Sequence, residues 1–180
     1  PGRSIERPVM LGDREHAPCA TVQHTIDVAE ADAEIRIAAG SYTGVSTRAG
    51  LTQMVYLSKT VKLVGGYTTS NWNTAYPLTQ TSTLNAQGLC RVIYVAGGSP
   101  LIQGLRLTGG DTTPLGAQET DGGGVFLDYG TSATIRNCQI DNNSADNGGG
   151  VFVQQNNATL EGNTIISNSA TFGGGVMTVF

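Results

Sequence analysis

The sequence predicts an all-β protein, a parallel β-helix in which short strands wind into stacked coils. The first observation is an ungapped repeat: residues 133–153 (ATIRNCQIDNNSADNGGGVFV) match residues 158–178 (ATLEGNTIISNSATFGGGVMT) at an offset of 25. The second is the pattern inside each unit, where short alternating apolar groups are separated by Gly, Asn and Ser. Repeats of this length can also be helical, but the glycine content excludes a helix here.

Coils that stack at a constant offset place equivalent residues in columns. Residues 99–110 match residues 132–143 at an offset of 33, with an insertion before Gly122, so the repeat extends upstream. We expect two inward apolar columns and a third column at a bend; they consist of Ile102, Ile135 and Leu160; of Leu107, Ile140 and Ile165; and of Leu105, Cys138 and Asn163.

Two further sets of residues belong to the predicted turns. Asn143 and Asn168 are expected to stack at a bend, where their side chains satisfy backbone groups and neighbouring amides. The glycine triplets 122–124, 148–150 and 173–175 are expected at a tight corner, where a positive φ or a close backbone approach excludes a side chain.

The N-terminal part is predicted to cap this solenoid. Residues 1–18 are expected to be an extended arm or linker, and residues 19–180 a single β-helix domain. Within it, residues 21–30 predict a short helix, with Thr21 as N-cap and with Val22, Ile26 and Ala29 on one face. A helix of this kind covers the core that the first coil would otherwise expose.

Strands are expected to follow the helix, with Ile35 and Ile37 pointing inward. Two long loops, 43–55 and 68–81, are predicted to interrupt the early coils. In residues 91–98 the alternation leaves two inward pairs open, Val92 with Tyr94 or Ile93 with Val95.

Composition limits the classes of function. The formal net charge is -4, only 13% of residues are charged, and no basic cluster is present, which argues against nucleic acid as a partner. No run of 18 or more apolar residues predicts a membrane span. The three cysteines show no CxxC spacing and predict neither a complete disulfide framework nor a zinc site. Cys138 is expected in the core, and Cys19 and Cys90 are compatible with a disulfide in an oxidising compartment.

Several segments together resemble a known family. PCATVQHTIDVA, EIRIAAGSYTG, VKLVGGY, LIQGLRLTGG and the NNSA…GGGV units are similar to secreted bacterial right-handed parallel β-helix proteins of the pectate-lyase-like superfamily. The tail also resembles the repeats of polymorphic outer-membrane proteins. The resemblance covers about residues 19–180 and implies a right-handed coil and an extracellular or cell-surface location.

Polysaccharide lyases of that superfamily imply carboxylates that hold Ca²⁺ beside an Arg or Lys base. Asp121, Asp141 and Asp146 are the candidate metal ligands, and Asp111 and Glu119 lie in the same acidic insertion. No base can be named, so no catalytic residue is predicted, and enzymatic activity is the less favoured interpretation. The alternative is that these acids are solvated turn residues, with Ca²⁺ as the one conceivable cofactor.

Other polar and aromatic side chains have two interpretations each. Arg136 is expected to form an ion pair with Glu161 on the next coil. Trp72 and Tyr76 are candidates for a platform that stacks on sugars, although aromatic residues of such a loop more often fold back over the solenoid.

The repeat reaches residue 180 within a unit, so the last coil is expected to be open. Open strand edges pair with other chains unless they are blunted. The expected interface comprises Val176, Met177, Val179 and Phe180 at this end, and an N-terminal donor arm that contains Ile5, Val9, Met10 and Leu11. Downstream coils of a longer chain, or an unrelated partner, are the alternatives.

The expected function is therefore a non-catalytic structural or adhesive module that assembles head to tail, like a filament. A calcium-dependent polysaccharide-degrading or carbohydrate-binding protein is the alternative.

Overall fold

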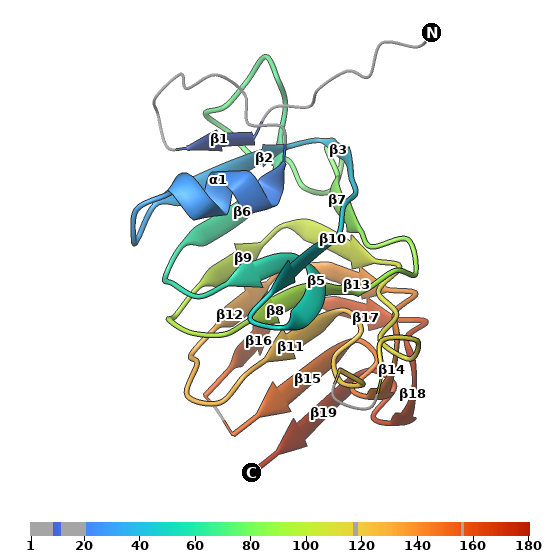
Figure 1. Ribbon diagram of the computed structural model, residues 1–180. Coiled ribbons are helices and arrows are strands. Elements are labelled where there is room, and N and C mark those ends of the chain that lie inside the picture. The colour runs from blue at the N-terminus through green and yellow to red at the C-terminus, as the bar shows by residue number, and fades with distance from the viewer. Residues whose placement is uncertain (1–8, 12–20, 117–118, 156) are drawn as a thin grey trace, which may run out of the picture.

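The computed structural model describes residues 9–11, 21–116, 119–155 and 157–180, with the side chains of residues 9–11 excepted. The described chain winds through three mainly parallel sheets that stack into a solenoid, with one short helix at the N-terminal end (Figure 1). This is the predicted β-helix.

The three sheets take strands from successive coils. Sheet A consists of β1 (Val9–Leu11), β2 (Glu34–Ala38), β6 (Lys62–Tyr67), β9 (Leu101–Gln103), β12 (Thr134–Arg136) and β16 (Thr159–Glu161). Sheet B consists of β3 (Gly40–Tyr42), β7 (Ser82–Asn85), β10 (Leu105–Thr108), β13 (Gln139–Asp141) and β17 (Thr164–Ile166). Sheet C consists of β4 (Ser46–Arg48), β5 (Leu51–Leu57), β8 (Arg91–Val95), β11 (Val125–Leu127), β15 (Val151–Gln154) and β19 (Val176–Val179). A fourth pair joins β14 (Ser144–Asn147) to β18 (Ser169–Phe172).

The strand register confirms the predicted inward columns. Ile135 is paired with Ile102 on one side and with Leu160 on the other. In sheet B the same relation joins Leu107, Ile140 and Ile165. The members of the inner coils are fully buried, so alternation along the strands positions the core as the sequence predicts.

Backbone conformation explains the residues at the corners. Gly104, Asn137 and Gly162 all have φ between 51° and 64° where the chain passes from sheet A to sheet B. The first glycine of each triplet also has a positive φ, as at Gly148 (60°) and Gly173 (66°). Positive φ is therefore the reason for the first glycine of each triplet. Close backbone approach is the reason for the later glycines of the inner triplets, where a Cβ would contact the backbone of the next coil.

Three elements close the N-terminal end. Helix α1 (Val22–Val28) begins after Thr21, whose side chain accepts a hydrogen bond from the His24 N–H, and it buries Val22 and Ile26 against the core. Strand β1 pairs antiparallel with β2, and β4 pairs antiparallel with β5. The edges of sheets A and C are thus occupied at this end, where Figure 1 shows β1 and α1 together.

The prediction of a loop over residues 43–55 was wrong, because β4 and the first half of β5 form a hairpin there. The apolar–polar alternation of a strand is not visible in this segment because a polar residue takes an inward position. Gln53 is fully buried, and its side chain donates to the Ser46 carbonyl. Residues 68–81 do form the predicted loop, with only a single bridge between Thr68 and Asn71.

The open choice in β8 is also decided. Ile93 and Val95 are in register with the inward Val125 and Leu127. Tyr94 is in register with Phe126 on the outer face, where neighbouring side chains bury it.

Candidate functional site

The C-terminal coil differs from every other coil because all its strands are sheet edges. β16, β17 and β19 each end a sheet, and β18 ends the two-stranded pair. Unlike β2 and β5 at the other end, none of these four strands has an antiparallel strand on its outer side among the described residues. Such an edge is a template for further strand pairing.

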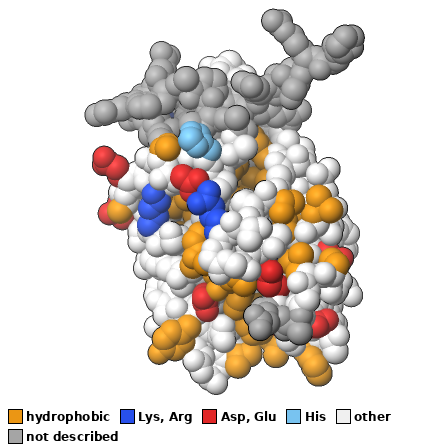
Figure 2. Space-filling view, in the orientation of Figure 1, with side chains coloured by type: hydrophobic (Ala, Val, Ile, Leu, Met, Phe, Trp, Pro, Cys, Tyr) orange, Lys and Arg blue, Asp and Glu red, His pale blue; other side chains and the backbone are white. Residues whose placement is uncertain are grey.

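Apolar side chains accompany these edges. Ile135 and Ile140 are fully buried, whereas their equivalents Leu160 and Ile165 are only partly buried because no coil lies over them. Five large apolar residues of the last coil are exposed: Ile166 (51%), Phe172 (63%), Val176 (38%), Val179 (38%) and Phe180 (93%). Figure 2 shows hydrophobic side chains gathered at this end of the molecule. An apolar partner would bury these side chains favourably, whereas a polar partner would not.

The structure places the predicted interface residues at opposite ends. Val176, Val179 and Phe180 are exposed on or beside β19, and Met177 is half-buried. Val9, Met10 and Leu11 form β1, whose backbone pairs with Ile37, Arg36 and Ile35 of the same chain. Ile5 lies outside the described residues.

Asparagine side chains connect consecutive coils at two bends. At the bend after sheet B, Asn143 Oδ1 accepts the Gly110 N–H (2.8 Å) and Nδ2 donates to the Leu107 carbonyl (3.2 Å). One coil later, Asn168 Oδ1 accepts the Asn143 N–H (3.0 Å) and Nδ2 donates to the Ile140 carbonyl (2.8 Å). This confirms the predicted structural role of both residues.

The bend between sheets A and B uses the same device in the last coil. Asn163 Oδ1 accepts the Cys138 N–H (2.9 Å), and Asn163 Nδ2 donates to the Ile135 carbonyl (2.8 Å). Each of these asparagines therefore binds backbone groups of the coil before it, and the N–H of Asn143 is in turn bound by Asn168 of the next coil.

The candidate calcium ligands do not form one site. Asp141 is buried on sheet B, where Arg106 Nε and Nη2 donate to its carboxylate at 2.9 and 2.6 Å. Hydrogen bonds from Arg106 hold the pKa of Asp141 below its ordinary value. Asp121 accepts from Asn147 Nδ2, while Asp146 is exposed on β14. The described part of the chain contains no group of three or more acidic, His or Cys residues placed to hold a metal ion.

The acidic insertion is instead tied down by Arg91, which sequence analysis did not single out. This buried guanidinium donates through Nη2 to the Glu119 and Asp121 carbonyls, at 2.8 and 3.0 Å. Its Nε and Nη1 have no hydrogen-bond partner, and burial lowers the pKa of Arg91. The guanidinium lies over the rings of Tyr94 and Phe126, at 5.3 and 5.4 Å from the centroids, which offsets part of the cost of burying the charge.

The structure also gives contacts for the predicted aromatic residues Trp72 and Tyr76 and for the predicted ion pair of Arg136. Trp72 stacks on Tyr67 (6.0 Å between ring centroids), whereas Tyr76 is 51% exposed, so the sugar-stacking role of this loop stays a prediction. Arg136 is in register with Glu161 but its Nε donates to Gln103 Oε1 at 2.8 Å, so the expected ion pair is replaced by an amide contact with the preceding coil.

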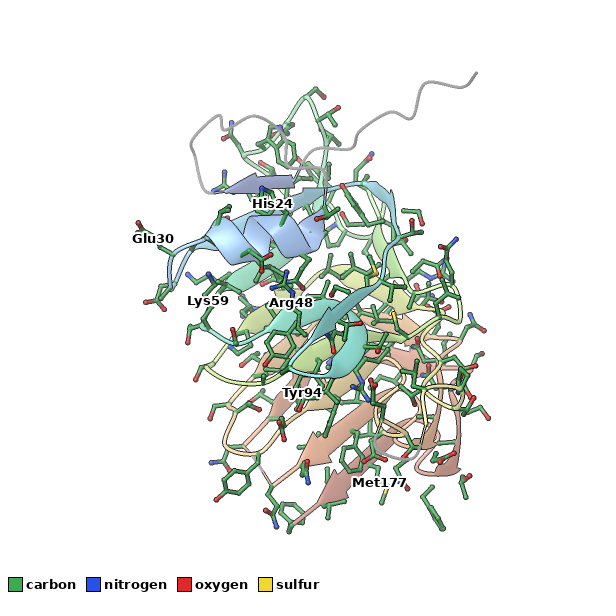
Figure 3. All side chains as sticks on the ribbon, viewed as in Figure 1. His24, Glu30, Arg48, Lys59, Tyr94 and Met177 are labelled. Atoms are coloured by element: carbon green, nitrogen blue, oxygen red, sulfur yellow. The ribbon has the colours of Figure 1, made fainter. Side chains whose placement is uncertain are left out.

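An aromatic column on the outer face of sheet C was also missed. Tyr56, Tyr94, Phe126 and Phe152 are in register, with ring centroids 5.0–5.7 Å apart, and Met177 follows. Figure 3 shows the labelled Tyr94 and Met177 on this face. The sequence signal for this column is the phenylalanine that recurs in the middle of VFL (125–127) and VFV (151–153) in successive units.

A groove of about 390 Å³ crosses sheet B. Arg106, Gln139 and Thr164, which are in register on three consecutive coils, lie along it. Pro77 and Leu78 of the 68–81 loop also line it.

The two described cysteines, Cys90 and Cys138, are both buried free thiols. Cys138 is buried and free, as expected, and burial raises its pKa to about 11. Cys90 is likewise a buried free thiol with its pKa raised to about 11 by burial, and Cys19 lies outside the described residues. In this structure neither described thiol is placed to react.

Comparisons with known proteins agree with this architecture. Residues 58–179 match a family model described as a right-handed β-helix region. Comparison with curated proteins found no match, and neither did comparison with solved structures. Within the described residues, no helix has the length and apolar character needed to cross a bilayer. The family match spans more than half of the sequence and coincides with the stacked sheets, so the chain belongs to the family of proteins with a right-handed β-helix region.

Proposed function

We propose that the protein is a non-catalytic structural or adhesive β-helix module that is joined to a further β-coil through its C-terminal coil. One observation carries the proposal: the N-terminal edges of sheets A and C are occupied by antiparallel strands, whereas every strand of the last coil is an edge. Among the described residues, a further parallel coil would thus meet open strand edges in every sheet only at the C-terminal end, because at the N-terminal end β3 of sheet B is the one parallel edge strand.

The chemistry of the last coil supports this proposal. Between residues 157 and 180 the only ionisable side chain is Glu161, so an apposed coil meets almost no charge. The exposed apolar residues provide the burial that favours docking. A role without catalysis is supported by the engagement of the acids, since Asp141, Asp121 and Glu119 each bind a neighbouring group.

Head-to-tail assembly of copies of this chain requires that β1 and β4 first leave the edges that they occupy. A neighbour's C-terminal coil can reach the first coil's sheet A edge only if β1 leaves β2, and β4 blocks sheet C in the same way. An extracellular or cell-surface location is part of the proposal and rests on the resemblance to secreted β-helix proteins.

The experiment lengthens the chain by a second copy of residues 156–180, which continues the repeat in register after Phe180. We expect the added coil to dock, so that amide hydrogen exchange in β16–β19 slows and the midpoint of thermal unfolding rises. A copy with scrambled sequence is the control. Unchanged exchange in both lengthened chains would overturn the proposal.

One substitution sharpens this test. A Cβ at Gly150 would lie 2.4 Å from the Gly175 carbonyl oxygen of the next coil, whereas a Cβ at Gly175 has no neighbour closer than 3.8 Å. Gly175→Ala is therefore expected to be harmless in the 180-residue chain and to prevent docking in the lengthened chain. Docking that tolerates Gly175→Ala would contradict parallel stacking.

The groove on sheet B favours carbohydrate binding as a second candidate function. Arg106, Gln139 and Thr164 present polar groups at the spacing of stacked coils, about 4.8 Å, which suits an extended chain of hydroxyl-bearing units. Calorimetry with uronate and neutral oligosaccharides tests it, with Gln139→Ala expected to weaken binding and Thr134→Ala on sheet A as the control. No heat of binding at millimolar ligand would exclude this candidate.

A further inference from the structure

The groove on sheet B contains a single charged side chain. Among the described residues that line it, only Arg106 carries a charge at neutral pH. The other lining residues are apolar or present uncharged amide and hydroxyl groups, and Gln139 and Thr164 continue the polar row across the next two coils. A ligand in this groove therefore meets one cation and otherwise uncharged hydrogen-bonding groups.

The charge of Arg106 is already compensated by Asp141. Arg106 Nε and Nη2 donate to Asp141 Oδ1 and Oδ2 at 2.9 and 2.6 Å. Asp141 is 2% exposed, and its Oδ2 also accepts from Asn142 Nδ2 at 2.6 Å, so a ligand cannot reach this carboxylate. Arg106 is 37% exposed, and only two of the five N–H groups of a guanidinium are used by the pair. The others can donate to a ligand oxygen.

An acidic ligand gains little from such a compensated cation. A carboxylate that approached Arg106 would compete with Asp141 and would be repelled by it, while losing part of its own hydration. The formal net charge of -4 also disfavours the approach of a polyanion. A hydroxyl group, in contrast, can accept from a remaining N–H without displacing Asp141, and its desolvation costs much less.

The 68–81 loop adds an apolar surface that is held in place. The Tyr76 N–H donates to the Gly66 carbonyl at 2.6 Å, and Pro77 packs so closely that a Cβ at Gly66 would lie 2.6 Å from the Pro77 nitrogen. Leu78, the next residue, is 97% exposed. Pyranose rings combine apolar C–H faces with hydroxyl groups at their edges, so they suit a groove that offers both kinds of surface.

We infer that the groove on sheet B binds an uncharged oligosaccharide, and that the Arg106–Asp141 pair disfavours acidic sugars such as uronates. Asp141 is then a specificity-determining residue, because it neutralises the cation that an acidic sugar would need. This inference rests on the carbohydrate-binding function proposed for the groove and names its substrate class.

Calorimetry of the full chain with a neutral and a uronate oligosaccharide of equal length tests this selectivity. We expect the wild type to bind the neutral ligand at least about tenfold more tightly. Asp141→Asn keeps the shape of the side chain and leaves Arg106 uncompensated, so the affinity for the uronate should rise at least about fivefold, while that for the neutral ligand changes less than about twofold. Asp146→Asn removes the same charge at an exposed position on β14 and is the control.

The outcomes separate the selectivity from carbohydrate binding itself. A wild type that prefers the uronate, or a folded Asp141→Asn that gains no more uronate affinity than Asp146→Asn, would overturn the inference and leave carbohydrate binding intact. If Asp141→Asn does not fold, the ranking of the two ligands by the wild type decides. If neither ligand binds the wild type at millimolar concentration, carbohydrate binding in this groove fails, and the inference fails with it.

Discussion

Asparagine at a bend gives two hydrogen bonds that the backbone itself cannot make. Asn143 is 1% exposed, and its amide joins the Gly110 N–H and the Leu107 carbonyl of the preceding coil. The residue before it, Asn142, has a positive φ of 54°, which turns the chain at this bend. The side chain therefore replaces the missing strand pairing at the corner.

Asn143→Ala is expected to lower the free energy of unfolding by about 2–4 kcal/mol, because it leaves two buried backbone groups unpaired. Urea denaturation measures this loss. Asn73→Ala in the exposed 68–81 loop is the control and should change stability by less than about 0.5 kcal/mol. Similar losses for both variants would show that the bend amide is dispensable.

The Arg106–Asp141 pair makes stability depend on pH. The folded-state pKa of Asp141 is lowered by Arg106, so the pair stabilises the protein above the unfolded pKa of about 3.9, and this contribution is lost as the pH falls through the lower folded value. We expect Asp141→Asn to cost about 1–2 kcal/mol at pH 7, a moderate figure because Arg106 is 37% exposed.

Urea unfolding at pH 7 and pH 3 tests the direction. The difference between the wild type and Asp141→Asn should shrink at pH 3, because the unfolded chain then binds a proton at this carboxyl, which the lowered folded-state pKa disfavours in the native protein. Asp146→Asn, at an exposed position on β14, is the matched control. A difference that grows on acidification contradicts the assigned role of the pair.

At the scale of elements, the glycine triplets allow neighbouring coils to approach closely. The inner triplets pack backbone against backbone: a Cβ at Gly149 would lie 2.3 Å from the Ser169 carbonyl oxygen. The turn between β14 and β15 therefore has no room for a side chain. In the last triplet a Cβ at Gly174 would lie 3.1 Å from the Asn168 carbonyl oxygen, and one at Gly175 would have no neighbour closer than 3.8 Å, because no coil follows in the described chain.

Gly150→Ala is expected to destabilise the protein by about 3 kcal/mol, and Gly175→Ala by less than about 1 kcal/mol, although both are third glycines of a triplet. Thermal or urea unfolding of the two variants is a direct comparison, since the chemical change is identical. Equal effects would mean that chain conformation, and not the next coil, requires the glycine.

At the scale of the whole molecule, the two ends have opposite character. α1 and β1 lie at one end and the last coil at the other (Figure 1). The last coil presents exposed Phe172, Val176 and Phe180. An exposed apolar edge promotes association of the purified chain even when its preferred partner is absent.

Val176→Lys is expected to reduce concentration-dependent association at least about fivefold, because a buried lysine disfavours any contact at this end. Sedimentation velocity measures the association. Val45→Lys, at a position 48% exposed in the N-terminal half, controls for added charge. If both lysines act alike, association does not occur through the last coil.

Removal of residues 3–12 distinguishes two roles for the N-terminal segment. Because β1 pairs with β2 in the same chain, we expect deletion to free this edge and to increase association in the same sedimentation assay. Loss of association on deletion would instead favour the donor-arm interpretation, in which this segment docks on a neighbouring copy.

The sequence by itself determined the solenoid, its inward columns and its corner residues, because these depend on local alternation and on a constant offset that brings equivalent residues together. Ile135 and Ile140 were predicted in this way, as were the bend roles of Asn143 and Asn168. Only the tertiary structure decided which partner each polar or outward-facing residue takes. Asp141 binds Arg106, Arg91 is buried beneath the insertion, and β1 pairs with β2. Such choices depend on distances between coils and on competition among neighbouring donors, which no residue pattern along one chain records.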